Sequence, residues 1–418
     1  MLAINGGKKT VPDGLRIESY PPINKSDLEM VSSSLQNTNT INGEQEDIYL
    51  WEKEWKEYCN SEYCLATNSG TAALHMAVAA AGVEPGDEVI TTALSWTSSA
   101  TCILHHGGIP VFADINPDTY NIDVTKIEAL ITNKTKAILP VHLYGQMSDM
   151  DPIMEIAKKY NLKVIEDACQ AHGSTYKGRL AGTIGDIGCF STQMSKLISG
   201  TEGGLLITNN NSLFEKAARI RQFGEKKTKD GTREYNAHGM GWMYRTSKLA
   251  AALCRSQFRN IDKYINTLNE NCNYLNENLS GIKGLKLPTI LPDCQSTWWD
   301  YKIKFCPEEL NLDISHRDFT EKVSAAIEAE GVFLTRWEFV IPAMSLFQEK
   351  IGFGKGYPWS IQDSNFIDYN LKQYPEALAA IDCIRGIYCI KAPNGIELME
   401  HYVKAIKKVF SNINQVLC

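Results

Sequence analysis

The sequence has no surplus of positive charge. Its 42 Lys and Arg residues stand against 49 Asp and Glu residues, so the formal net charge is −7 over 418 residues. Proteins that bind nucleic acids or anionic membranes usually show a clustered basic excess. The one dense charge run, 225–234, mixes both signs and is interpreted as a solvated loop. We therefore expect no nucleic-acid partner and no anionic-membrane partner.

Long apolar runs and paired cysteines are also missing. No stretch of about 18 uninterrupted apolar residues is present, so we expect no membrane span, and residues 1–14 lack the apolar run of a secretion signal. The twelve cysteines include no CxxC pair and no zinc-ligand spacing. We expect buried, reduced thiols in a cytoplasmic protein without a metal. Cys418 is expected to be an exposed thiol without a function.

The length of the chain predicts more than one domain. A chain of 418 residues exceeds what one compact core usually contains. Residues 1–45 are polar and rich in turn formers, and they predict an N-terminal arm or loop. Residues 46–255, which begin with a helix near Ile48, predict a large domain, and 256–418 predict a connecting helix with a smaller C-terminal domain.

Apolar runs alternate with amphipathic stretches between residues 64 and 210. The expected strands are Glu88–Ala93, Ile109–Ile115, Lys136–Leu143, Lys163–Ala168, Gly188–Ser191 and Gly204–Thr208, with expected helices at 96–106, 125–132 and 151–160. This alternation predicts an α/β fold, with a mainly parallel mixed sheet covered by helices on both faces. Ligands bind such sheets at the carboxyl ends of the strands, where Asp167 lies.

The second half of the chain predicts a mixture of helices and strands. The expected elements are a long helix over 246–280, a strand at 298–305, a helix at 318–331 and a closing helix at 396–411. The aromatic-rich segment 335–375 is interpreted as loop.

Lys196 and Asp167 together predict the chemistry. Lys196 follows an apolar run that ends in Ser191, and burying a charged lysine is costly unless it has a partner. An imine removes that charge, while an acid such as Asp167 keeps a pyridine nitrogen protonated, and pyridoxal phosphate (PLP) enzymes need both groups. The alternatives from the residues alone are a surface lysine and a loop-capping acid.

Other residues suit the same cofactor. Residues 68–71 precede a strong helix-forming run, and a helix start of small and hydroxyl residues is a ready phosphate site or a simple N-cap. The hydroxyl of Ser191 is a further candidate to donate a hydrogen bond to the phosphate. Trp96 either stacks on a pyridine ring or packs in the core, and Gln170 either reaches the phenolic oxygen of PLP or bonds within its loop.

The histidines suggest no metal site. His142, His172 and His238 lack metal-ligand spacing, and we expect them to be structural or substrate-lining. The sequence contains no GxSxG, HExxH or Walker motif.

As a whole, the chain resembles the PLP-dependent sugar and cyclitol aminotransferases of fold type I. The resemblance is carried by NSGTAAL (68–74), AGVEPGDEVI (81–90), LSWTSSA (94–100), GGIPVFADI (107–115), TKAILPVHLYGQMSDMD (135–151), IEDACQAHGS (165–174), GTIGDIGCFS (182–191) and the EGG that follows Lys196. It runs from about residue 50 to 255 and continues more weakly to the end of the chain.

The resemblance implies a function and a set of roles. It implies an aspartate-aminotransferase-like homodimer with active sites at the interface, PLP as cofactor, a small-molecule ketone substrate, and glutamine or glutamate as amino donor. Lys196 would form the Schiff base and transfer the proton, with pyridoxamine phosphate as the intermediate carrier, and Asp167 would bind the pyridine nitrogen. Gln170 would lie near the phenolic oxygen and Trp96 on the ring. The phosphate would be held by Gly70, Thr71 and Ser191.

Two departures from the family pattern bear on the substrate. Met243 stands where an asparagine usually reaches the phosphate of the neighbouring subunit. The segment 334–342 replaces a His-Tyr-Pro segment common in nucleotide-sugar members, which favours the branch acting on cyclitols and aminoshikimate-type rings. Arg336 in this segment either meets the substrate or forms a surface salt bridge.

Other functions remain open at this point. Within the family they are amination of a nucleotide-linked ketosugar and ring chemistry like that of aminohydroxybenzoate synthase. Outside it, the alternative is a non-catalytic PLP-binding regulator. Dehydration by PLP relatives is disfavoured, because those relatives carry histidine in place of the lysine.

Overall fold

The computed structural model describes residues 1–228, 232–361 and 367–417. Parts of two segments interpreted above, 229–231 and 362–366, lie outside the described residues, and so does Cys418. No helix of the described ranges is long and apolar enough to cross a membrane.

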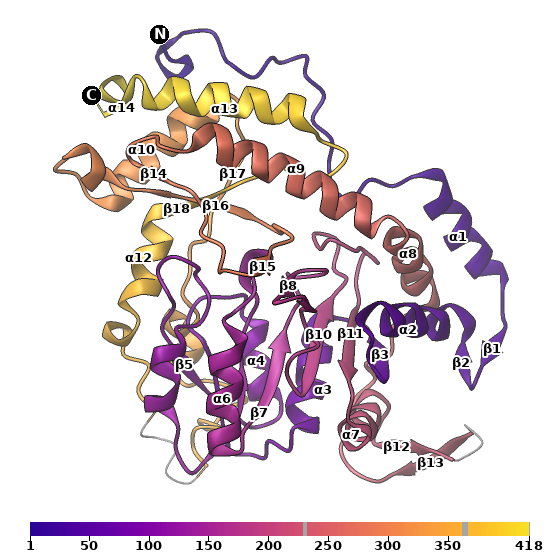
Figure 1. Cartoon of the computed structure of the whole chain (residues 1–418). Helices are drawn as coiled ribbons and strands as arrows, with labels where there is room; N and C mark the ends of the chain where they lie inside the picture. The colour runs from indigo at the N-terminus through magenta and orange to yellow at the C-terminus, as the bar shows by residue number, and fades with distance from the viewer. Residues whose placement is uncertain (229–231, 362–366, 418) are drawn as a thin grey trace.

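A seven-stranded sheet forms the centre of the larger part of the molecule (Figure 1). Five neighbouring strands are parallel, while β11 runs antiparallel to both of its neighbours. The spatial order is β3 (Tyr63–Thr67), β11 (Gly204–Thr208), β10 (Ile187–Ser191), β7 (Lys163–Asp167), β6 (Thr135–Leu139), β4 (Glu88–Thr92) and β5 (Ile109–Ala113). The predicted α/β fold with a mainly parallel mixed sheet is confirmed.

Helices cover both faces of this sheet, because both faces are apolar. Consecutive strand residues belong to two separate cores: Val164 packs in one and Ile165 in the other. The first core includes side chains of α2 (Glu46–Cys59) and α6 (Met150–Tyr160). The second includes side chains of α3 (Gly70–Ala80) and α4 (Ser98–His105). Continuous apolar strands are the pattern that a doubly covered parallel sheet requires.

The predicted strands are present, with shifted ends. The strand expected at Lys136–Leu143 ends at Leu139, because Pro140 has no N–H to donate to a ladder. The helix expected over 125–132 is shorter, with α5 at Val124–Ile127 and a 3-10 turn at Glu128–Leu130. Strand β3 and helix α7 (Asn211–Arg221) are not among the elements expected from the sequence.

A four-stranded antiparallel sheet forms the centre of the C-terminal part. Its order is β14 (Leu285–Lys286), β16 (Tyr301–Phe305), β18 (Ile384–Ile387) and β17 (Leu334–Thr335). Helices α10 (His316–Ala329) and α13 (Ile396–Phe410) pack here and match the helices expected at 318–331 and 396–411. Helix α12 (Pro375–Cys383) leads into β18.

The helix expected over 246–280 is two helices. Helix α8 (Lys248–Phe258) and helix α9 (Ile261–Leu279) are separated at Arg259 and Asn260, and Asn260 has non-helical dihedral angles (φ −105°, ψ 9°). A domain boundary at 255/256 would fall inside α8. We therefore propose the break at Asn260 as the division between the two parts.

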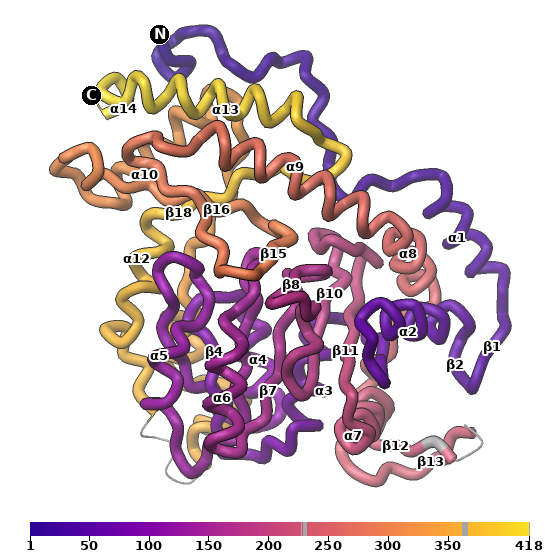
Figure 2. The backbone as a smooth tube through the Cα atoms, in the orientation of Figure 1, coloured from indigo at the N-terminus to yellow at the C-terminus, as the bar shows by residue number. Residues whose placement is uncertain are grey.

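The N-terminal segment is more ordered than an arm or loop. Helix α1 (Lys25–Gln36) starts with a capping box, in which Asn24 and Asp27 satisfy each other's backbone N–H groups. Before α1, the chain runs beside the C-terminal helix α13 (Figure 2). Buried Glu330 holds it there by accepting hydrogen bonds from Ala3 N at 2.8 Å and Thr10 N at 3.0 Å.

Two further loop predictions need correction. The charge run at 225–234 contributes to a hairpin, β12 (Glu225–Lys227) and β13 (Arg233–Ala237), in which the opposite charges of Glu225 and Arg233 pair across the strands. The segment 335–375 contains short helices at Ile341–Ala343, Ser345–Gln348 and Leu371–Gln373.

Candidate active site

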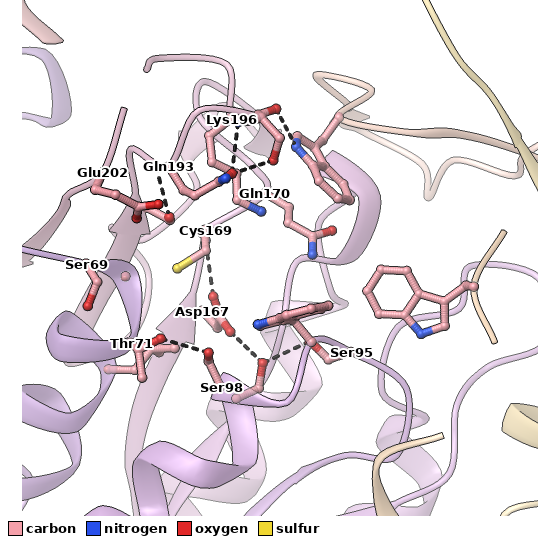
Figure 3. Close-up of a pocket in the computed structure, with 18 residues that line it drawn as sticks. Ser69, Thr71, Ser95, Ser98, Asp167, Cys169, Gln170, Gln193, Lys196 and Glu202 are labelled. Atoms are coloured by element: carbon pink, nitrogen blue, oxygen red, sulfur yellow. Dashed lines mark hydrogen bonds between the residues drawn. The ribbon is translucent and has the colours of Figure 1, made fainter. Parts of the chain in front are cut away.

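A cavity of about 450 Å³ lies where β7 and β10 end and α3 begins (Figure 3). All seven residues proposed from the sequence line this cavity. They are Gly70, Thr71, Trp96, Asp167, Gln170, Ser191 and Lys196. The parallel sheet explains the convergence, because the carboxyl ends of its strands meet at one edge.

Asp167 is the last residue of β7 and is only 4% exposed. Its Oδ2 accepts a hydrogen bond from Ser99 Oγ at 2.7 Å, and its Oδ1 accepts one from Cys169 N at 3.2 Å. Ser95 Oγ lies 2.9 Å from Ser99 Oγ and extends the network (Figure 3). The carboxylate is thus held in one orientation at the wall of the cavity.

The preceding residue, Glu166, faces the other side of β7 and has a structural role. Its carboxylate lies 2.8 Å from His142 Nε2 and accepts backbone N–H groups of the 182–185 turn. His142 Nδ1 accepts from Ser148 N at 3.1 Å, which places the ring proton on Nε2, facing Glu166. His142 is therefore structural, one of the two roles expected for it.

Lys196 lies in the loop between β10 and β11. A turn positions it, with Lys196 N donating to Gln193 O at 2.8 Å. Its Nζ lies 4.2 Å from the centroid of the Trp299 ring. Burial lowers the pKa of Lys196, and the neighbouring side chains of Cys169 and Asp167 offset part of this effect. A lysine with a lowered pKa has a larger fraction of the neutral, nucleophilic amine.

The start of α3 provides an anion-binding corner. Ser69 caps the helix by accepting from Ala72 N at 3.0 Å, and Thr71 Oγ1 lies 2.8 Å from Ser98 Oγ. A Cβ atom at position 70 would lie 2.7 Å from Ser191 Cβ, so glycine allows β10 and α3 to approach closely. Free N–H groups and the positive end of the helix dipole favour a phosphate here.

Gln170 and Trp96 complete the predicted set. Gln170 Oε1 accepts a hydrogen bond from Tyr144 N at 2.9 Å, which leaves its amide N–H₂ group as the donor. Trp96 is 57% exposed, and its ring makes an edge contact with Phe339 at 5.8 Å between centroids. The alternative that Trp96 packs in the core is therefore wrong.

Sequence reasoning missed several lining residues. Trp299 and Trp337 reach the cavity from the C-terminal part, and Cys169 and Glu202 line it beside residues that were predicted. The one available signal was the Trp298–Trp299 pair in a polar stretch. Because contacts between distant segments decide which side chains reach the cavity, the local sequence did not identify them.

Two residues at positions where the chain differs from the family pattern do not line this cavity. Arg336 forms ion pairs with Glu321 at 2.8 Å and with Glu328 at 3.2 Å, so the surface salt bridge expected as one alternative is present. Met243 is 50% exposed. Within the described ranges, no group of three or more His, Cys, Asp or Glu side chains is placed to hold a metal ion.

The chemistry of the lining residues fits PLP. An anion-binding helix start suits its phosphate, a carboxylate suits its pyridine nitrogen, and an amine of lowered pKa suits its aldehyde. The indole faces suit its planar ring.

Comparison with known proteins agrees with this assignment. Residues 21–340 match the model of the DegT/DnrJ/EryC1/StrS aminotransferase family. The chain belongs to this family.

Three curated relatives that are similar to this chain carry different names. GDP-perosamine synthase of Caulobacter vibrioides is 43% identical over 52% of this chain and 58% of its own length, so the match spans little more than half of that relative. The spore coat polysaccharide biosynthesis protein SpsC of Bacillus subtilis is 35% identical over 68% of this chain and 75% of its own. A putative L-glutamine:3-amino-2,3-dideoxy-scyllo-inosose aminotransferase of Micromonospora echinospora is 36% identical over 65% and 64%.

Solved structures share the fold over nearly the whole chain. An aminotransferase from Psychrobacter cryohalolentis superposes with a TM-score of 0.81 at 26% identity and covers 96% of this chain and 100% of its own. A 3-amino-5-hydroxybenzoic acid synthase gives a TM-score of 0.81 at 21% identity, with 95% and 99% coverage, and this likeness concerns the fold alone.

Proposed function

We propose that this member of the DegT/DnrJ/EryC1/StrS aminotransferase family transfers an amino group from glutamine or glutamate to a ketosugar or keto-cyclitol, with PLP as cofactor. The observation that carries the proposal is that Asp167, at the end of β7, and Lys196, in the loop after β10, line one cavity beside the start of α3. The family match over residues 21–340 supports the reaction type.

The cofactor would be held by residues of the large sheet. Gly70, Thr71 and Ser191 would bind the phosphate at the start of α3, and Asp167 would bind the pyridine nitrogen. Trp96 would stack on the ring, and Gln170 would donate to the phenolic oxygen. When bound, PLP supplies an aldehyde that accepts the amino group and a ring that takes up electrons.

Lys196 would carry the proton chemistry. Its Nζ would hold the aldehyde in the resting enzyme and, once displaced by the donor, would accept the proton from the donor Cα. The same nitrogen would return a proton to the carbon of the acceptor in the second half-reaction. Since burial lowers the pKa of Lys196, less free energy is needed to obtain the neutral amine that accepts this proton.

The aromatic lining supports a ring-shaped acceptor. Trp96, Trp299 and Trp337 line the cavity, and Lys196 is the one cation in its described lining. Indole rings pack against the C–H faces of saturated rings, and the hydroxyl groups of a polyol remain at the edges. This lining favours a keto-cyclitol or an unphosphorylated ketosugar.

A nucleotide-linked ketosugar is the second candidate. The observation that favours it is the 43% identity to a protein named GDP-perosamine synthase, the highest identity among the relatives described here. The replacement of the His-Tyr-Pro segment by 334–342 counts against it.

A ketone panel tests the proposal and separates the candidates. The PLP-loaded chain would be incubated with glutamine or glutamate and with a keto-cyclitol such as scyllo-inosose or a GDP-linked ketosugar, and the aminated product measured by mass spectrometry. We expect amination of the keto-cyclitol and none by Lys196→Ala. Cofactor binding without turnover of any ketone would favour a regulator, and an aromatic ring-closed product would favour synthase-like chemistry.

We also propose a homodimer that works in the cytoplasm. Large apolar side chains are exposed around the β12–β13 hairpin: Tyr235 is 83%, Met240 is 74% and Met243 is 50% exposed. Such a patch is suited to a second copy of the chain. The eleven described cysteines are unpaired thiols, which suits a reducing compartment. Light scattering that gave the mass of a monomer would contradict the dimer.

A further inference from the structure

Two side chains of the C-terminal part of the chain donate hydrogen bonds to the peptide carbonyl that precedes Lys196. Ser195 O accepts two hydrogen bonds, one from Trp299 Nε1 at 3.0 Å and one from Lys391 Nζ at 2.9 Å. The carbonyl after Lys196, Leu197 O, accepts a hydrogen bond from the hydroxyl of Tyr20. The backbone on both sides of Lys196 is therefore fixed by residues distant in sequence.

Lys391 contacts both Ser195 O and the ring of Tyr20. It lies beyond β18 and lines a second cavity of about 380 Å³, which shares Ser195 and Trp299 with the cofactor cavity. Its ammonium group lies 5.0 Å from the centroid of the Tyr20 ring and 5.5 Å from that of Trp299. Two aromatic faces and one carbonyl oxygen thus surround the nitrogen.

No carboxylate neutralises Lys391 directly. Within the part of the chain that the structure describes, its Nζ makes no ion pair, and the nearby Asp300 pairs instead with Lys302 at 2.6 Å. The indole of Trp299 lies against both Lys196 and Lys391. The site therefore holds two amines that repel each other when both are protonated.

The charge of Lys391 depends on that of Lys196. Burial and then the positive charge of Lys196 lower the pKa of Lys391 to about 7, while Asp300 raises it in part. With Lys196 protonated, a large fraction of Lys391 is consequently neutral near neutral pH. Once Lys196 is neutral, the repulsion disappears and Lys391 binds a proton more tightly.

We propose that Lys391 is a positioning residue for Lys196: it fixes the carbonyl that precedes Lys196 and takes over the positive charge of the site when Lys196 becomes neutral. The role of Lys196 rests on the proposed function, but the contacts and the coupling of the two amines do not. The proton that Lys196 must lose to act as a nucleophile then has an acceptor within the same site.

Charged and titratable side chains from several segments surround Lys391, and of these Lys196 and Asp300 shift its pKa. The surrounding side chains are those of Lys196, Asp300, Glu18, Tyr20, His172, Tyr388 and Cys389. Only Lys196 changes its charge during the proposed reaction, so we assign the coupling to this residue.

The coupling is measured by competitive acetylation of the full-length chain over a pH series, with mass spectrometry of the peptide that contains Lys391. We expect the midpoint for Lys391 to rise by about one pH unit or more in Lys196→Met, because the like charge is gone. The control Lys404→Met removes an exposed lysine of α13 and should leave the midpoint unchanged. An equal midpoint in wild type and Lys196→Met would overturn the charge-sharing role.

Positioning is measured separately by hydrogen exchange of the loop 192–203. Lys391→Gln keeps an N–H donor without the charge, whereas Lys391→Met removes both. We expect faster exchange in Lys391→Met and near wild-type exchange in Lys391→Gln. If Lys391→Met fails to fold, Lys391→Gln still tests the charge. The glutamine at position 391 is neutral in every state, so cofactor loading should release a proton to solvent that the wild type retains. Equal exchange in wild type and folded Lys391→Met, or equal proton release in wild type and Lys391→Gln, would overturn the proposal.

These readouts are independent of turnover. If the titrations of Lys196 and Lys391 are coupled but the chain aminates no ketone, the role of Lys391 stands and the proposed function fails. If the chain aminates a ketone but the titrations are not coupled, the proposed function stands and the role of Lys391 fails.

Discussion

Ser99 donates a hydrogen bond from its hydroxyl to Asp167 Oδ2 at 2.7 Å. This bond joins the first turn of α4 to the end of β7, two elements separated by 68 positions in the sequence. The orientation of the carboxylate that would bind the pyridine nitrogen thus depends on a helix from another βα unit.

Ser99→Ala tests this dependence. A hydrogen bond to a charged group contributes about 1.5–3 kcal/mol, so turnover should fall roughly tenfold to a hundredfold if the bond orients Asp167 during the reaction. The same substitution at Thr101, a partly exposed residue of α4, is the control and should leave the rate near that of the wild type. Equal rates for Ser99→Ala and wild type would show that Asp167 needs no help from α4.

Asp167→Asn separates cofactor binding from catalysis. A neutral amide keeps most of the shape of the side chain but no longer favours a protonated ring, so we expect measurable cofactor binding with most of the turnover lost. Equilibrium dialysis and initial rates measure the two effects. Full turnover by this variant would contradict the role proposed for Asp167.

Gly70→Ala tests the anion-binding corner. The added Cβ would lie 2.7 Å from Ser191 Cβ and 3.0 Å from Cys169 Sγ, so α3 and β10 must move apart. We expect PLP affinity to fall by about tenfold or more, since the N–H groups at the helix start are displaced. Gly14→Ala, where a Cβ meets no atom within 4 Å, is the matched control. Unchanged affinity in Gly70→Ala would place the phosphate elsewhere.

His75 makes the fold sensitive to acid. It is buried, its Nδ1 lies 2.9 Å from Tyr244 Oη, and burial, with His106 and His105 beside it, lowers its pKa to about 3. Between about pH 6.5, the ordinary histidine value, and pH 3, the unfolded chain binds a proton here that the folded chain does not. The free energy of unfolding therefore falls as the pH falls through this range.

Denaturant unfolding over a pH series measures this contribution. His75→Gln should show a shallower loss of stability below pH 6.5 than the wild type. The control His316→Gln changes an exposed histidine that pairs with Glu308 at 3.3 Å. A slope in His75→Gln as steep as in the wild type would assign the acid sensitivity to other groups.

The site residues that could be predicted from the sequence are those that lie at or just after the end of a strand. Asp167, Gln170, Ser191 and Lys196 each follow or close an apolar run, and the parallel sheet brings these ends together. The large sheet was predictable for the same reason: its strands are continuous apolar runs between amphipathic helices.

The contributions of the C-terminal part could not be predicted in this way. Trp299 and Lys391 reach the loop of Lys196 through contacts that span 104 and 196 positions. No local period marks such residues. The break between α8 and α9 was likewise hidden, because the apolar spacing continues through Asn260 without a proline or glycine.

Lys196 is the residue proposed to hold PLP, and borohydride reduction of the PLP-loaded full-length chain identifies the lysine that does so. Reduction fixes the cofactor to the amine that binds it, and peptide mass spectrometry then locates the modified lysine. We expect a phosphopyridoxyl group on Lys196 and none on the neighbouring Lys391. A modified Lys391 with Lys196 unmodified, or a chain with no fixed cofactor, would contradict it.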